Sequence, residues 1–180
     1  MAKQLLPRAL TTLIDELGNL PGVGVRTAER YAYHLLRTKA ESNKRLSNSI
    51  ANLKANVKYC PATFALIDAD EEISSLYADP TRNKKVIAVV EEPLDIIAIE
   101  RTGQYNGTYH VLGGVISPID NIGPEQLHIK ELIIRIKQDE VEEIIIATNA
   151  SVEGESTALF LQRYIKENEI NVKMSRLARG

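Results

Sequence analysis

Apolar residues at helical spacing run through the first third of the chain, residues 1–57. Leucines and isoleucines recur every three or four positions across 5–17, and Gly18 follows as a residue type that often ends helices. The same spacing returns over 26–37 and 41–57. Because residues three or four positions apart lie on one face of a helix, the pattern predicts three amphipathic helices.

From residue 85 onward, short apolar runs alternate with amphipathic stretches. The predicted strands are 86–90, 108–112, 143–148 and 170–177, and the predicted helices are 94–102, 127–138 and 155–167. Near-continuous apolar strands such as VIAVV and IIIA are typical of a parallel sheet that is covered on both faces. The pattern therefore predicts an α/β domain over 85–180 with a mainly parallel, Rossmann-like sheet, preceded by the helical region.

The segment between these two regions, 58–84, has no apolar periodicity. It contains polar clusters, acidic runs and two prolines, Pro61 and Pro80. Such composition is typical of loops. We therefore expect an insert or linker here.

Composition excludes several classes of protein. At 180 residues, with 44% hydrophobic and 26% charged residues, the chain suits a soluble globular protein with a real core. No apolar run reaches the roughly 20 residues that span a bilayer, and the N-terminus lacks the apolar core of a signal peptide, so we expect a cytoplasmic protein. The single cysteine, Cys60, excludes an internal disulfide and a four-cysteine metal site within one chain.

The formal net charge of −2 conceals a strong asymmetry. Residues 1–60 contain ten lysines and arginines against four acidic residues, whereas residues 61–180 contain twelve against twenty. A basic first third is typical of a nucleic-acid contact. A solvated helical surface would show the same charge, so charge alone does not distinguish it from a nucleic-acid contact, and specific residues must do so.

The turn LPGVG between the first two predicted helices carries candidate chemistry. Gly22 and Gly24 allow a tight turn and a close approach of another chain, and the next helix begins with free N–H groups that attract anions. Arg26 and Arg30 lie four residues apart on that helix, on one face. The pattern is that of a phosphate-binding unit. An ordinary glycine-containing turn with surface arginines is the alternative interpretation, and the pattern does not exclude it.

Acidic residues follow two of the predicted strands. Glu91 and Asp95 come after 86–90, and Glu153 and Glu155 come after 143–148. Parallel strands place their carboxyl ends at one edge of a sheet, where open α/β folds bind ligands, so these carboxylates are candidates for Mg²⁺ and phosphate chemistry. Glu153 and Glu155 also suit the simpler role of complementing a helix dipole.

Several long segments, in order, resemble the RecR family of bacterial recombination mediators. They are LPGVGVRTAERYAYHLL, which is similar to that family's helix-hairpin-helix, and VVEEPLDIIAIERTGQYNGTYHVLGGVISPIDNIGPEQLHIKELIIRI, ATNASVEGESTALFL and SRLARG, which are similar to its Toprim domain. The resemblance implies a non-enzymatic DNA-binding protein that acts with RecO and RecF to help load RecA at single-strand gaps. It also implies a ring-like homo-oligomer, a dimer or tetramer, that binds gapped or junction DNA through Gly22, Gly24, Arg26 and Arg30.

The chain departs from the family at its zinc site. Where members carry two Cys-x-x-Cys pairs, this sequence has Cys60, Thr63, Ser74 and Tyr77. Because Thr, Ser and Tyr cannot replace thiolates around tetrahedral zinc, we predict no zinc and no other cofactor. We expect packing to hold the insert instead, through Tyr59, Phe64, Leu66, Ile73 and Leu76. Family members also continue beyond Ala-Arg-Gly, where this chain ends, which leaves the oligomeric state open.

Catalytic Toprim domains pair a glutamate with an Asp-x-Asp motif, and only the glutamate, Glu91, is present here. The aspartate positions are Asn149 and Ser151, which removes two anionic Mg²⁺ ligands. We therefore expect no catalysis, and an acidic docking surface of Glu91, Asp95, Glu153 and Glu155 for a basic partner. The alternatives are a Mg²⁺-dependent nuclease or phosphotransferase that uses these carboxylates, and a scaffold without DNA contact. For His110 we favour a structural role.

Overall fold

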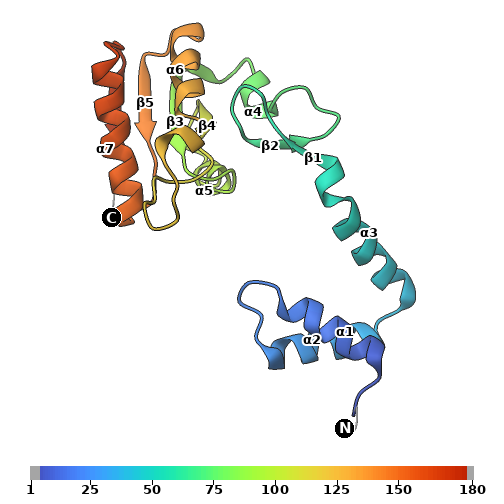
Figure 1. The fold of residues 1–180 in the computed structure, drawn as a ribbon. Helices are drawn as coiled ribbons and strands as arrows, with labels where there is room; N and C mark the ends of the chain where they lie inside the picture. Colours follow the sequence, from blue (N-terminus) through green and yellow to red (C-terminus); the bar gives the residue numbers. More distant parts are fainter. Residues whose placement is uncertain (1–4, 178–180) are drawn as a thin grey trace. The chain divides into compact units, whose positions relative to one another are not determined.

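The computed structural model describes residues 5–177 (Figure 1). The chain divides between Lys54 and Ala55 into two compact units. Within the described residues, no helix is both long enough and apolar enough to cross a membrane.

The first unit contains the three predicted helices. They are α1 (Arg8–Gly18), α2 (Val25–Arg37) and α3 (Ala40–Asn56), the last of which belongs to this unit through Lys54. Ala28 and Ala32 are the buried residues of α2, and a Cβ placed on Gly18 would lie 4.0 Å from the Cβ of Ala28. Small residues therefore let α1 and α2 pack closely. The side chain of Asn43 donates to the carbonyl of Leu35 at 2.8 Å, which ties the start of α3 to the end of α2.

The second unit contains a four-stranded sheet of order β4-β3-β5-β6, in which every neighbouring pair is parallel. Its strands are β3 (Asn83–Val90), β4 (Gly107–Val111), β5 (Glu143–Ile146) and β6 (Lys173–Arg176). Its helices are α5 (Asp95–Glu100), the 3-10 turn η1 (Pro124–Gln126), α6 (Ile129–Gln138) and α7 (Val152–Glu167). The predicted fold class is confirmed, although α7 begins three residues before the predicted helix.

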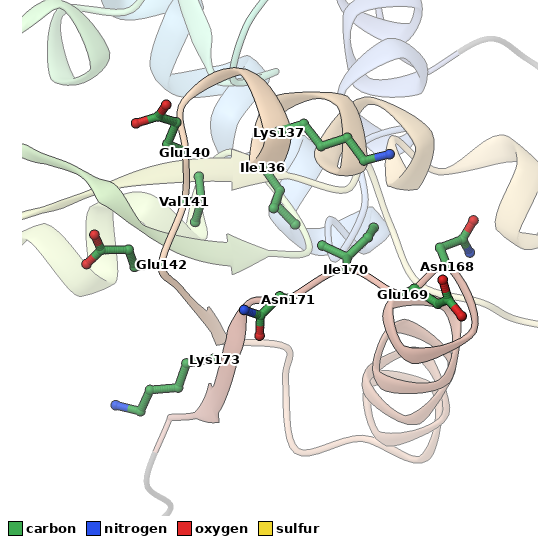
Figure 2. Close-up of a pocket in the computed structure, with 10 residues that line it drawn as sticks. All are labelled: Ile136, Lys137, Glu140, Val141, Glu142, Asn168, Glu169, Ile170, Asn171 and Lys173. Atoms are coloured by element: carbon green, nitrogen blue, oxygen red, sulfur yellow. The ribbon is translucent and has the colours of Figure 1, made fainter.

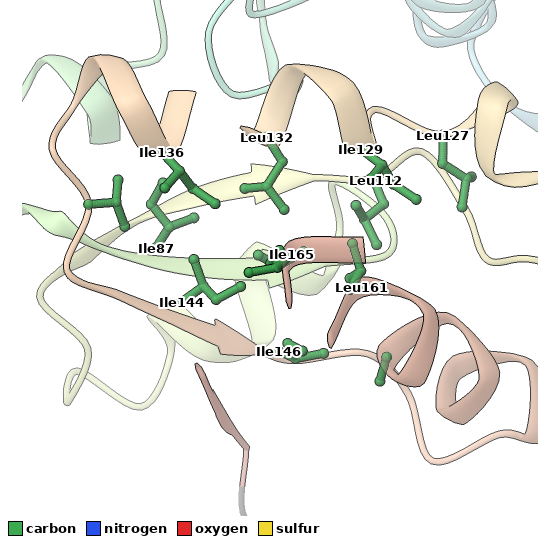
Figure 3. Close-up of a cluster of buried hydrophobic side chains, with 13 residues drawn as sticks. Ile87, Leu112, Leu127, Ile129, Leu132, Ile136, Ile144, Ile146, Leu161 and Ile165 are labelled. Carbon is green, nitrogen blue, oxygen red and sulfur yellow. The ribbon is translucent and has the colours of Figure 1, made fainter. Parts of the chain in front are cut away.

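One face of this sheet packs against α6 and α7 (Figure 3). Alternate residues of β3 and β5, among them Ile87 and Ile144, meet Leu132 of α6 and Leu161 of α7. These four side chains are completely buried. The apolar residues that follow the two-residue period of the strands thus pack against those that follow the helical period of α6, in one core.

The opposite face packs against α5 and the segment 58–84. Ala88 and Tyr109 point to this face, where Ile96 of α5 and Phe64 of the segment cover them. The segment is more regular than expected. It contains an antiparallel hairpin of β1 (Val57–Tyr59) and β2 (Leu66–Asp68), and the single-turn helix α4 (Ser75–Ala78). Elements of three or four residues are too short to show a period.

Candidate functional site

The hairpin turn between α1 and α2 exposes its two glycines. Gly22 has φ +77°, a conformation that L-residues adopt only with strain, whereas Gly24 has φ −78° and directly precedes α2. The N–H of Val23 donates to the carbonyl of Leu20 at 3.0 Å, which closes the turn. A Cβ on either glycine would meet nothing within 4 Å, so another molecule can approach this backbone closely.

The amino end of α2 offers unused hydrogen-bond donors. No side chain caps the helix, its first turn contains no acidic residue, and the backbone N–H groups of Val25 and Arg26 have no acceptor within residues 5–177. The side chains of Arg26 and Arg30 are exposed, and neither has a carboxylate partner in this part of the chain. Free N–H groups, the positive end of a helix and two guanidinium groups together suit an anion such as phosphate.

The carboxylate edge of the sheet is arranged differently from the expectation. Glu91, at the end of β3, is only 7% exposed, and both of its carboxylate oxygens accept hydrogen bonds from Asn149. The backbone N–H of Asn149 lies 2.7 Å from Oε1, and its side-chain Nδ2 lies 2.6 Å from Oε2. Asn149, which stands where catalytic Toprim domains have an aspartate, therefore donates two hydrogen bonds to the carboxylate of Glu91.

The other three predicted carboxylates have separate roles. Asp95 accepts from the N–H of Glu92 at 2.8 Å, a local turn contact. Glu155 forms an ion pair with Arg176 of β6, at 2.7 Å, whereas Glu153 is half-buried. Within residues 5–177, no group of three or more His, Cys, Asp or Glu side chains is placed to hold a metal ion. Three of the four carboxylates that the sequence offered as candidates for one crevice thus have partners of their own, Glu91, Asp95 and Glu155.

Gly154 is a part of this edge that the sequence analysis did not single out. A Cβ at this position would lie 2.3 Å from the carbonyl oxygen of Asn149 and 2.8 Å from Oε1 of Glu91. Its N–H donates to Oγ of Ser151, the N-cap of α7, at 2.9 Å. Glycine destabilises a helix, so its presence in the first turn of α7 was a sequence signal that the backbone there approaches other atoms closely.

Two sequence-family models match the chain in the order of its units. A RecR helix-hairpin-helix model matches residues 10–54, and a Toprim-domain model matches residues 85–178. Recombination protein RecR of Moorella thermoacetica is 48% identical over 174 residues, which is 97% of this chain and 85% of that protein. The RecR protein of Streptomyces avermitilis is 48% identical over 168 residues, 93% of this chain and 82% of that protein.

The chain belongs to the RecR family. The resemblance inferred from the sequence segments is thereby confirmed, and so is the combination of a helix-hairpin-helix with a Toprim sheet. Family membership makes this a protein of recombinational DNA repair.

Of the four residues that the resemblance places at a zinc site, the retained Cys60 and two of the three substitutions, Thr63 and Ser74, form a buried, hydrogen-bonded cluster. Cys60, Thr63 and Ser74 are at most 5% exposed. The N–H of Ser74 donates to Sγ of Cys60 at 3.3 Å, and the carbonyl of Thr63 accepts from the N–H of Val111 in β4 at 2.9 Å. Burial raises the pKa of the Cys60 thiol, but hydrogen bonds from Thr63 and from backbone N–H groups outweigh it and lower that pKa.

The third substitution, Tyr77, connects the insert to the carboxyl end of α6. Its hydroxyl donates to Asp139 at 2.9 Å, and the guanidinium of Arg135 lies 4.8 Å from its ring centroid. Arg135 is buried, pairs with Asp139 at 3.1 Å and donates to Oγ1 of Thr108 at 2.7 Å and to the carbonyl of Tyr109. Burial, followed by the bond to Asp139, raises the pKa of Tyr77. A polar network thus fastens the insert.

The expected apolar brace of this insert is only partly present. Phe64 and Leu76 do pack against the second core cluster, as predicted. Tyr59 and Leu66 are 62% and 45% exposed, so the prediction was wrong for them. Both lie on the outer side of a two-stranded hairpin whose other side faces the core, and a one-residue alternation decides which side chain is buried.

His110 lies in the middle of the second unit. Its Nε2 is 2.7 Å from the carbonyl oxygen of His128, and its ring contacts Phe64 edge-on at 5.5 Å between centroids. Burial disfavours the charged imidazolium and lowers the pKa of His110 to about 3. A neutral histidine that donates to a backbone carbonyl inside the core fits the structural role that the sequence analysis favoured.

A hollow of about 670 Å³ lies at the opposite edge of the sheet, at the amino ends of β5 and β6 (Figure 2). Its rim carries charges of both signs, including Lys137, Glu140 and Glu169. Two further rim residues are paired outside it, Glu142 with Lys85 and Lys173 with Glu143. Because the rim carries both signs of charge, it does not favour a ligand of either charge. The candidate sites are therefore the hairpin and the carboxyl edge of the sheet.

Proposed function

We propose that this protein is a non-enzymatic DNA-binding mediator of recombinational repair. It acts with RecO and RecF to help load RecA at single-strand gaps, in the bacterial cytoplasm where the chromosome lies. The observation that carries the proposal is the uncapped amino end of α2, where two unused N–H groups stand beside exposed Arg26 and Arg30. Membership of the RecR family supports the pathway.

The DNA contact follows from the geometry of the hairpin. The backbone at Gly22 and Gly24 is open to close approach, and the two arginines add charge-assisted bonds to phosphate oxygens. Such contacts read no base sequence, and their affinity falls steeply with salt because each neutralised phosphate releases counterions. One hairpin gives weak binding. A dimeric or tetrameric ring multiplies it, since linked sites raise the effective concentration of one another.

The carboxylate edge supports the part of the proposal that excludes catalysis. Mg²⁺ needs several oxygen ligands with negative charge, and the two Asp-x-Asp positions hold neutral Asn149 and Ser151. Glu91 is buried with both oxygens engaged by Asn149, so a Mg²⁺-dependent nuclease or phosphotransferase would first have to break these two bonds. This arrangement favours the binding function over the enzymatic alternative.

We extend the proposal to a docking surface at the same edge, formed by Glu91, Asp95, Glu153 and Glu155, for a basic protein partner. Asp95, Glu153 and Glu155 are partly exposed and supply the charge. Glu91 acts from beneath by fixing the loop of Asn149. Alanine at Asp95 and Glu153 should weaken capture of RecO or RecF without affecting DNA binding, and unchanged capture of both partners would overturn this part.

The test of the proposed function uses one labelled gapped duplex for two readouts. The full chain should bind it in a salt-sensitive manner and should leave it uncut over hours in Mg²⁺. Cleavage that needs Mg²⁺ and disappears in Glu91→Ala would instead establish the nuclease. Failure of the folded chain to bind gapped, duplex and single-stranded DNA would favour a scaffold without DNA contact.

A further inference from the structure

The outward side of α2 carries a regular stripe of three arginines and one tyrosine. Its members stand at positions i, i+4, i+7 and i+11 of the helix, and they are Arg26, Arg30, Tyr33 and Arg37. At about 100° per residue these four side chains fall within roughly 60° of one another around the helix axis. The buried residues of α2, Ala28 and Ala32, point to other sides, so the stripe faces solvent.

Tyr33 is the unusual member of this stripe. Its side chain is 57% exposed, and its hydroxyl has no hydrogen-bond partner within residues 5–177. The guanidinium of Arg37 lies 5.9 Å from its ring centroid, which is within the range of a cation–π contact. An aromatic ring that is more than half exposed, whose hydroxyl is not hydrogen-bonded and which has cations on both sides along the helix, offers a face to a planar ligand.

We propose that Tyr33 and its flanking arginines form a stacking site for an unpaired nucleobase. This inference rests on the proposed function, because it places single-stranded DNA along the helix whose amino end grips phosphate. From Arg26 to Tyr33 the helix rises about 10 Å, which corresponds to about three nucleotides of a stacked strand at 3.4 Å each. A strand held by Arg26 and Arg30 therefore brings a base to Tyr33.

Base stacking on an aromatic ring tolerates every sequence and needs an unpaired base, because a duplex hides the faces of its bases. The site thus gives the hairpin a preference for the single-stranded side of a gap, which phosphate contacts alone cannot provide. A protein partner fits this stripe less well. It would have to neutralise three guanidinium groups, and Glu29, at the margin of the stripe, is the one acidic residue of α2.

The experiment compares Tyr33→Leu with Tyr33→Phe, which keeps the ring, and with Tyr31→Leu, which removes a 44% exposed tyrosine that lies off the stripe. Fluorescence anisotropy measures the Kd of the full chain for a labelled oligothymidine strand and for a blunt duplex. We expect Tyr33→Leu to weaken single-strand binding by about 5- to 50-fold and duplex binding by less than 2-fold. Tyr33→Phe should behave as the unmodified chain does. Tyr31→Leu removes a ring that lies 5.5 Å from the guanidinium of Arg30, and any loss it causes should be equal for strand and duplex.

A strand that contains 2-aminopurine reports stacking directly, since its emission changes when the base stacks on a ring. The unmodified chain and Tyr33→Phe should change this emission at saturation, and Tyr33→Leu should not. Equal losses on strand and duplex, or an unchanged Kd, would overturn the proposal. A changed sedimentation coefficient of Tyr33→Leu would assign the ring to a protein interface instead. The proposed function fails separately, if Arg26→Ala/Arg30→Ala binds duplex as tightly as the unmodified chain.

Discussion

Asn149→Asp tests the contact that engages Glu91 at the carboxylate edge. In the structure, Nδ2 of Asn149 donates to Oε2 of Glu91 at 2.6 Å, and Glu91 is 7% exposed. The substitution returns the residue that Mg²⁺-binding Toprim domains carry, but it replaces a donor with a second anion at nearly the same place. The variant should therefore fold less stably than the unmodified chain at neutral pH.

The expected loss of stability follows from the distance. Asn149 is exposed, so the effective dielectric constant lies between about 20 near a protein surface and 80 in water; with about 40, two unit charges roughly 3 Å apart repel by about 3 kcal/mol. The lost hydrogen bond to a charged group contributes about 1.5 kcal/mol more. Because two adjacent carboxylates can share a proton, part of this energy is recovered, and we expect a net loss of about 3 kcal/mol at pH 7.

Urea unfolding at several pH values measures this loss. Protonation removes the repulsion, so the difference between Asn149→Asp and the unmodified chain should shrink as the pH falls from 7 to 4. Mg²⁺ should also restore stability, by about 1.4 kcal/mol when its concentration is ten times its dissociation constant. Asn149→Ala is the matched control, since it loses the side-chain bond without adding charge. It should cost about 1.5 kcal/mol at pH 7, and Mg²⁺ should not restore this loss. If Asn149→Asp unfolds at the same urea concentration as the unmodified chain at pH 7, the inferred contact with Glu91 is wrong.

Four further variants test other parts of the molecule. Gly22→Ala should cost about 1 kcal/mol in urea unfolding, because its φ is +77°, whereas Gly24→Ala should leave stability nearly unchanged and still weaken DNA binding, since a methyl group separates the backbone from phosphate. Equal stability losses would contradict this. Tyr77→Phe should cost about 1 kcal/mol by removing the bond to Asp139, and a chelator should not change its Tm or that of the unmodified chain. The pKa of His110 is lowered to about 3 from 6.5, so unfolding takes up a proton between these values, and stability should fall as the pH drops through this window. His110→Gln should flatten that dependence, and an unaltered slope would argue against the buried neutral ring.

Regular elements of the fold follow from periodicity. The isoleucine-rich stretch of α6 and the apolar runs of β3 and β5 predicted their own structure, because each pattern repeats over several residues and buries one face. The hairpin of β1 and β2 escaped prediction, since three-residue strands contain less than two periods. Side-chain alternation within it decides that Ile67 is buried and Leu66 exposed, which hydrophobicity alone does not distinguish.

At the candidate site, too, local patterns were predictable from the sequence and contacts between distant residues were not. The hairpin residues are close in sequence, so local rules on glycine turns and helix ends were sufficient to propose Gly22, Gly24, Arg26 and Arg30 as a site. The carboxylate edge joins residues that are 58 positions apart, Glu91 and Asn149. From the sequence alone, Glu91 is expected to be an exposed carboxylate. In the fold it is buried and accepts two hydrogen bonds from Asn149. Such pairing depends on strand register and on the close approach at Gly154, neither of which a sequence pattern states.

The measurement that most directly tests the DNA-binding function is the salt dependence of the Kd for a gapped duplex. It compares the unmodified chain, Arg26→Ala/Arg30→Ala, and the control Lys44→Ala/Lys54→Ala, which loses the same charge from the exposed side of α3. We predict that the arginine variant binds far more weakly at low salt and that its slope of log K against log salt is smaller by about 1.8, the value for two phosphate contacts. The lysine variant should keep nearly the full slope. Identical slopes for all three proteins would contradict a DNA contact at the hairpin.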